Sequence, residues 1–102
     1  MAQALHLKLT ASGLVYTGSC RLRGFLVGMD GANDPTITIY DNTEASGDEV
    51  IPTNTYDSSQ LGLNGVSFPG DGVHCTKGVY CGITLGAGAV EVVIYYSPRH
   101  DM

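Results

Sequence analysis

The residues of this chain that are best suited to chemistry lie around Cys75. His74 directly precedes this cysteine, and Cys81 follows it. A cysteine nucleophile needs a histidine within hydrogen-bonding reach and a third group that orients the histidine. Neighbours on a strand point to opposite faces, so His74 and Cys75 are poorly placed for such a bond. Zinc sites prefer two cysteine or histidine pairs with closer spacing. We therefore predict neither catalysis nor metal binding here.

The cysteines are better interpreted as structural residues. The chain has three of them, Cys20, Cys75 and Cys81. An odd number cannot pair completely within one chain, and a cytoplasmic protein keeps its thiols reduced. Small free thiols pack in a core as hydrophobic groups. We predict structural free thiols, and the alternative is one bridge, either Cys20–Cys75 or Cys20–Cys81.

Serine and glycine-rich segments offer no stronger catalytic site. Asp57-Ser58-Ser59 could act with His74 in a serine hydrolase, but the chain has no G-x-S-x-G turn to hold the nucleophile. Glycine-rich segments 62–65 and 86–88 lack the Lys-Ser/Thr of a phosphate-binding loop. We predict no catalytic residues, and the protein is not expected to be an enzyme.

Acidic residues gather in the expected loops. They are Asp30, Asp34, Asp41, Glu44, Asp48 and Glu49. Oxygen-rich loops can bind Ca²⁺, but no EF-hand spacing is present. We favour the alternative of a solvated acidic rim, because repulsion between such rims keeps a densely displayed protein in solution. Neither a metal nor another cofactor is predicted.

The charge of the chain argues against nucleic-acid and membrane partners. The net charge is −5, and no lysine or arginine occurs between Gly24 and Thr76. Binding to phosphates requires a basic patch, and adhesion to an anionic membrane has the same requirement. No apolar run approaches the roughly 20 residues of a membrane span. Residues 1–10 lack the features of a signal peptide, which predicts synthesis in a cytoplasm.

Alternating apolar residues predict short β-strands. Leu5, Leu7 and Leu9 share one face of a strand near the N-terminus. Residues 36–40 alternate threonine with isoleucine, so the isoleucines should point inward. Residues 49–55 contain a proline, which restricts their strand to a sheet edge.

Two longer strands are predicted over residues 19–29 and 90–96. In the first, one face carries Cys20, Leu22, Gly24 and Leu26, and the other carries Arg21, Arg23, Phe25 and Val27. Gly24 and Gly28 are expected to mark a bulge or the close approach of another backbone. The strand over 90–96 is expected to form a hairpin with the strand before it, through the turn Gly86-Ala87-Gly88.

Turn signals about every 8–12 residues, with no stretch of helical periodicity, predict an all-β chain that forms a sandwich or a small barrel. The length favours one domain over residues 1–102. Residues 1–10 would supply either an N-terminal strand or an arm used in assembly.

Several segments, taken in order, carry a family resemblance. ThrIleThrIleTyrAsp (36–41) precedes the polar turn AsnThrGluAlaSerGly (42–47), PheProGlyAspGlyVal (68–73) leads into LysGlyValTyr (77–80), and ValIleTyrTyr (93–96) closes the last strand. This order, over about residues 20–96, resembles small jelly-roll-like structural proteins of tailed bacteriophages, found as head decoration proteins or in fibres and tail tips. The resemblance implies an antiparallel, jelly-roll-like β-sandwich of seven or eight strands.

The resemblance also implies a virion structural protein, first a capsid decoration or cement protein that stabilises the head. Its partners would be the major capsid protein and further copies of the chain in a homotrimer. It would lie on the capsid exterior after synthesis in the bacterial host cytoplasm. The candidate interface residues are Leu5, Leu7, Leu9, Arg21 and Arg23. The alternative is a receptor- or carbohydrate-binding module of a tail tip or fibre.

Overall fold

The described part of the chain consists of β-strands and their connections. The computed structural model describes residues 5–29, 34–55, 64–68, 72–84 and 90–98. Its strands are β1 (Leu5–Leu9), β2 (Gly13–Thr17), β3 (Cys20–Met29), β4 (Thr36–Tyr40), β5 (Glu49–Thr55), β6 (Asn64–Ser67), β7 (Val73–Cys75), β8 (Gly78–Thr84) and β9 (Val90–Pro98). Within these ranges no helix is present that could span a membrane. The predicted all-β class is confirmed.

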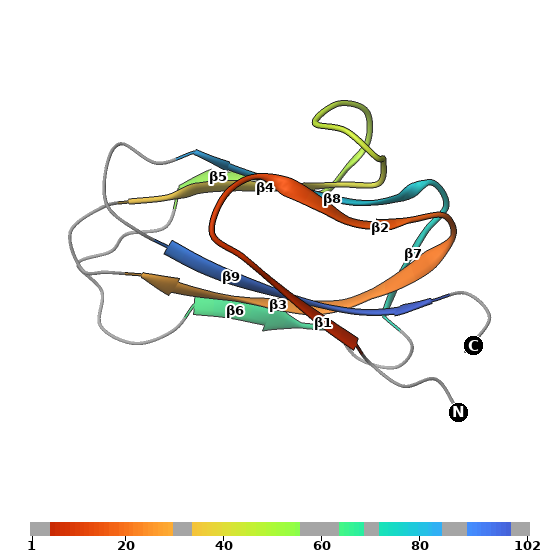
Figure 1. Ribbon diagram of the computed structural model, residues 1–102, viewed down its shortest axis with the longest axis horizontal. Helices are drawn as coiled ribbons and strands as arrows, with labels where there is room; N and C mark the ends of the chain where they lie inside the picture. Colours follow the sequence, from red (N-terminus) through yellow and green to blue (C-terminus); the bar gives the residue numbers. More distant parts are fainter. Residues whose placement is uncertain (1–4, 30–33, 56–63, 69–71, 85–89, 99–102) are drawn as a thin grey trace.

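The strands form two antiparallel sheets that stack face to face (Figure 1). The first sheet has the order β1-β9-β3-β6, and β7 also pairs with β3, beside β6 on the same edge. The second sheet has the order β2-β8-β4-β5. Because β6 and β7 share one edge, each sheet has four strand positions. Apart from the consecutive strands β4 and β5, which pair in the second sheet, the chain alternates between the sheets as a jelly roll does. The predicted antiparallel, jelly-roll-like β-sandwich is therefore confirmed.

The predicted hairpin between the last two strands is wrong. Both strands are present, but β8 pairs with β2 and β4, whereas β9 pairs with β1 and β3. Each has a buried apolar face, with Val79 and Cys81 on β8 and Val92 and Ile94 on β9. Stacking the two strands in opposite sheets turns both apolar faces into one core, whereas a hairpin would place them side by side. The predicted turn, residues 86–88, lies outside the described residues.

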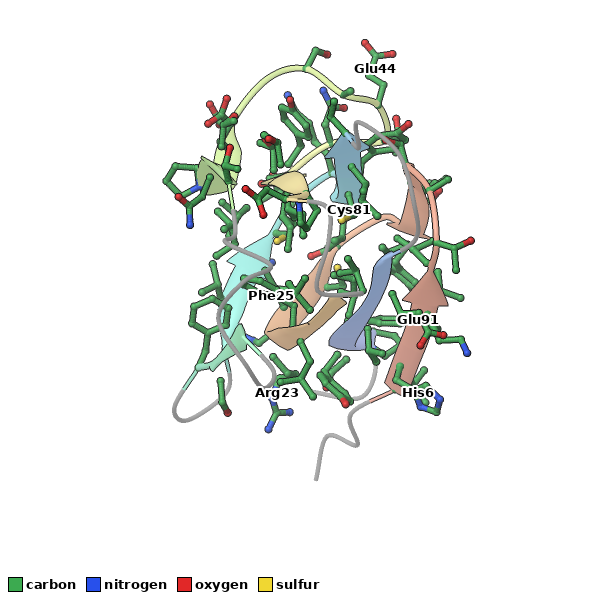
Figure 2. The ribbon with its side chains drawn as sticks, turned by 90° about the vertical axis from the view of Figure 1, so that its left-hand side faces the viewer. His6, Arg23, Phe25, Glu44, Cys81 and Glu91 are labelled. Carbon is green, nitrogen blue, oxygen red and sulfur yellow. The ribbon has the colours of Figure 1, made fainter. Side chains whose placement is uncertain are left out.

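A bulge in β3 corrects the predicted faces of this strand. The register with β9 shifts between Leu22 and Gly24. Before the shift Leu22 is fully buried, and after it Phe25 and Val27 are buried, at 1% and 0% exposure, while Leu26 is only half-buried. Figure 2 shows Phe25 pointing between the sheets. The bulge that glycine suggested is confirmed, but simple alternation wrongly grouped Leu26 with Leu22, whereas Phe25 and Val27 share the buried face of Leu22.

The core lies between the sheets and is almost entirely apolar. Its fully buried aliphatic and aromatic members include Leu22, Phe25, Val27, Ile37, Ile39, Val79, Val92 and Ile94. Burial of one such side chain contributes about 1.5–3 kcal/mol. The inward isoleucines of β4 and the edge position of β5, which contains Pro52, agree with the sequence predictions. These sheets provide rigid platforms for the surface groups described next.

Candidate functional site

The three leucines predicted at an interface lie on β1, which is an edge strand and pairs only with β9 among the described strands. Their shared face turns inward, opposite the inward residues of β9. Leu7 and Leu9 are half-buried and pack against the core, whereas Leu5 is 42% exposed. Of the three, only Leu5 presents much side chain to a partner, beside a strand edge with unpaired backbone groups.

The two predicted interface arginines lie on β3, separated from β1 by β9. Arg21 and Arg23 are half-buried, and Arg23 Nη1 donates a hydrogen bond to Ser97 Oγ at 3.1 Å. Figure 2 shows Arg23 pointing away from the core. The structure therefore does not join these arginines and the β1 leucines in one surface.

A surface that the sequence analysis missed covers the outer face of the second sheet. We call it the uncharged face, and its principal residues are Leu14, Thr36, Tyr40, Thr53, Thr55 and Tyr80. The four strands of this sheet carry a single charged residue, Glu49, at the end of the edge strand β5. Glu49 is exposed and lies opposite Tyr40, so the one charge in these strands is at the rim of the face, whereas most acids of the chain lie in its loops.

A row of large side chains crosses the uncharged face. Leu14 lies opposite Tyr80, and Tyr80 lies opposite Tyr40 on the next strand. The two tyrosine rings are 6.5 Å apart at 56°. Leu14 is 43% exposed, one of two large hydrophobic residues that are exposed in the described ranges. Aromatic residues with few charges are typical of the centre of a protein interface.

The side chains around this row are held in place by local bonds. The Ser12 hydroxyl donates to the Ile83 carbonyl oxygen at 3.0 Å and accepts from the Ile83 N–H at 2.7 Å, which holds the start of β2 against β8. Thr36 and Thr55 hydroxyls are 2.8 Å apart. Such bonds keep the face rigid, and rigid faces lose little entropy when they bind.

A groove on the first sheet offers a second kind of site. Its volume is about 530 Å³, and its lining includes Arg23, Leu26, Ser67, Phe68 and Tyr95. A concave site with aromatic walls and a few polar groups suits a small ligand. Planar aromatic rings next to an arginine and a hydroxyl could stack on and hydrogen-bond a sugar. The sequence alone did not place these residues together, because β6 meets β3 only in the folded chain.

Ser19 and His74 form a pair that the sequence analysis also missed. Ser19 Oγ lies 2.8 Å from His74 Nε2, and His74 is exposed. A catalytic serine–histidine pair requires a group that orients the histidine and donors for an oxyanion. Within the described ranges, the one side-chain hydrogen bond seen for the His74 ring is with Ser19, and either group could be its donor. The proposed partners in the segment 57–59 lie outside the described residues.

The cysteines lie where the structural interpretation predicted. Cys20, Cys75 and Cys81 are free and fully buried. Burial raises the pKa of the Cys81 thiol to about 12. A hydrogen bond to Cys20 together with burial raises the pKa of the Cys75 thiol. Because Cys75 is buried and His74 is exposed, the two point to opposite faces, as predicted for neighbours on a strand.

The Asp41 carboxylate binds the backbone of the turn between β7 and β8. Its Oδ2 accepts from Thr76 N at 3.0 Å, and its Oδ1 accepts from Lys77 N at 2.9 Å and Gly78 N at 3.4 Å. Burial of the carboxyl raises its pKa, but these hydrogen bonds outweigh burial and leave the pKa below its usual value. Asp41 is therefore occupied by the protein's own backbone.

The remaining acids do not form a metal site in the described part of the chain, where no three metal-ligating side chains cluster. Glu44, Asp48 and Glu49 are exposed, and Figure 2 shows Glu44 far out on the loop that joins β4 and β5. Asp30 lies outside the described residues.

Comparison with known proteins gives no relative: no family model, curated protein or solved structure matches this chain.

Proposed function

We propose that this chain is a capsid decoration protein of a tailed bacteriophage, a structural protein that stabilises the head. The observation that carries the proposal is the uncharged face on an otherwise acidic jelly roll. The centre of this face carries threonine, tyrosine and an exposed leucine. These side chains can lose their water at a lower cost than charged groups, which makes the face suited to permanent protein contacts. The resemblance to structural proteins of tailed bacteriophages is the reason for proposing a phage head as the partner.

Two of the segments that carry the resemblance, 36–41 and 77–80, meet in the fold, which supports reading these two as one unit. Asp41 ends the first segment, and its carboxylate binds the backbone of Lys77 in a later one. The rings of Tyr40 and Tyr80, from the same two segments, are in contact on the uncharged face. These two segments thus meet at one corner of the second sheet, whereas the closing segment 93–96 belongs to β9 in the first sheet.

The proposed action is mechanical. The uncharged face would dock on the major capsid protein at junctions between subunits, and burial of Leu14, Tyr40 and Tyr80 would oppose their separation. The edge of β1, with Leu5, would contact a neighbouring copy in a homotrimer. The protein would lie on the capsid exterior, and the β4–β5 loop with Glu44, which projects beyond the outer face of the second sheet (Figure 1, Figure 2), would flank the contact with the capsid.

The test of this proposal is location and binding. Gold-labelled antibody against the chain should decorate the heads of phage particles that carry it. Purified chain should also bind isolated head shells that lack it, and the bound shells should withstand higher temperature or lower ionic strength before they open. Shells that do not bind the chain, or particles without label on the head, would contradict the proposal.

The groove on the first sheet favours one alternative, a carbohydrate-binding module of a tail tip or fibre. Phe68 and Tyr95 would stack on sugar rings, and Arg23 would hydrogen-bond their hydroxyls. A glycan array should then show binding that Tyr95→Ala removes and that Leu14→Lys leaves unchanged. Label at the tail tip together with that result would replace the head assignment.

A further inference from the structure

Two of the three cysteines face each other across neighbouring strands. Cys20 on β3 lies directly opposite Cys75 on β7 in the antiparallel register, and both are fully buried. Residues that are directly opposite in an antiparallel pair have neighbouring side chains on one face of the sheet. Cys81 lies in the other sheet, opposite Ile39 and Gly13. The fold therefore favours Cys20–Cys75 over Cys20–Cys81, the two bridges that the sequence left open.

The position of this pair suits a disulfide. Residues directly opposite in an antiparallel ladder have Cα atoms about 4.5–5.5 Å apart. Disulfides span Cα separations of about 4.4–6.8 Å. Their side chains also share the inner face of the first sheet. A bond between the two sulfurs thus requires side-chain rotation and only small backbone movement.

We propose that Cys20 and Cys75 are a site of oxidative cross-linking, which a small disulfide oxidant such as oxidised glutathione converts into an intramolecular disulfide between β3 and β7. This inference does not depend on the proposed function. More than half of the chain lies between the two cysteines, so the bond would close a long loop that encloses β4, β5 and β6.

The chemistry balances without a cofactor. One cysteine thiolate attacks oxidised glutathione, forms a mixed disulfide and releases the first reduced glutathione. The second thiolate then attacks the protein sulfur of that mixed disulfide and releases a second reduced glutathione. Both cysteines are oxidised by one electron each, the oxidant takes up two electrons, and the two thiol protons pass to the released glutathione thiolates.

Access to the buried sulfurs would come from opening of β7. This strand is only three residues long, and among the described strands it pairs with β3 alone. Two hydrogen bonds with side chains hold β7 in place. One joins Ser19 and His74, and in the other the Asp41 carboxylate accepts from the N–H of Thr76, which directly follows the strand. Short edge elements open at lower free energy than a whole domain unfolds. The oxidant would therefore react with Cys75 while β7 is open. When β7 pairs with β3 again, Cys20 would lie next to the mixed disulfide and could attack it.

The test compares the purified protein in reduced and oxidised glutathione. After oxidation, alkylation in denaturant should count one free thiol in place of three. The intact mass should fall by two hydrogen atoms, and peptide mapping should join the peptides of Cys20 and Cys75. The melting temperature should rise by roughly 5 °C or more, because a cross-link that closes a long loop restricts the unfolded chain.

Matched variants separate this bond from other thiol chemistry. Cys81→Ala should cross-link as the original chain does and leave no free thiol, whereas Cys75→Ala should form no intramolecular bond. Mapping of the original chain gives the answer even if a variant fails to fold. A link that includes Cys81, dimers only, or three free thiols after oxidation in mild denaturant would overturn the proposal.

Discussion

The carboxylate of Asp41 accepts a hydrogen bond from the backbone N–H of Lys77 at 2.9 Å, across a sequence separation of 36 residues. The same carboxylate also binds the N–H groups of Thr76 and Gly78. Asp41 stands at the end of β4, and the three N–H groups belong to the turn into β8 and to its first residue. One side chain thus fixes the junction of β7 and β8 relative to β4.

Loss of this carboxylate should destabilise the fold. Asp41→Ala leaves three backbone donors without their acceptor, and partial exposure to water limits the penalty. We expect a loss of about 1–3 kcal/mol in the free energy of unfolding, measured by urea denaturation. Asp48→Asn, which changes an exposed acid in the same loop, should stay within about 0.5 kcal/mol of the original chain.

The same contact predicts a dependence of stability on acid. The pKa of Asp41 is lowered in the folded chain, so its ionised form stabilises the fold at neutral pH. That contribution is lost as the pH falls from the usual value of 3.8 through the lower folded-state pKa. Melting temperatures of the original chain and of Asp41→Asn should therefore converge below pH 3.8 and differ most at neutral pH. A constant difference down to the lowest pH would contradict this account.

At Gly78, the first residue of β8, adding one methyl group should strongly lower the free energy of unfolding. Its φ is +150°, and a Cβ there would overlap the Tyr16 carbonyl oxygen and lie 3.4 Å from the Asn42 oxygen. Gly78→Ala should cost about 1–3 kcal/mol, because backbone atoms cannot rotate away as a side chain can. Gly82→Ala is the control in the same strand, since its nearest neighbour would be Tyr40 Cε1 at 3.5 Å. If Gly78→Ala and Gly82→Ala lowered the melting temperature equally, this explanation would be refuted.

The bulge in β3 determines which of two neighbouring residues, Phe25 or Leu26, matters more for stability. Phe25 is 1% exposed in the core, whereas its neighbour Leu26 is half-buried on the outer face. Phe25→Ala should cost about 3–5 kcal/mol, a large part of the 5–15 kcal/mol typical of a domain. Leu26→Ala should cost much less. Denaturation curves that rank the two variants in the opposite order would show that the bulge is misplaced.

The strand faces could be predicted wherever the ladder is regular. Alternation placed Ile37 and Ile39 inside, and both are fully buried. It failed in β3 because one extra residue at the bulge exchanges the two faces beyond it. The glycine indicated that a bulge was possible, but not on which side of it the pattern would change.

The partners of each strand could not be predicted from local patterns. The strands β8 and β9 follow each other closely, and such a pair forms either a hairpin or a crossing between sheets. The choice depends on whether better neighbours exist elsewhere, such as β1 and β3 for β9. The uncharged face was missed for the same reason, because Leu14, Tyr40 and Tyr80 become neighbours only through pairing of β2, β8 and β4.

Leu5 and Leu14 form a matched pair that separates the two proposed contacts. They are 42% and 43% exposed, so a change to lysine at either position should cost little stability. Leu14→Lys places a charge on the uncharged face and should weaken binding to head shells at least tenfold, because that charge would lose its water in the contact. Leu5→Lys places the charge beside the edge of β1 and should shift sedimentation from trimer towards monomer. Reduced shell binding by Leu5→Lys alone, with full binding by Leu14→Lys, would move the capsid contact to the β1 edge and leave the uncharged face without its proposed role.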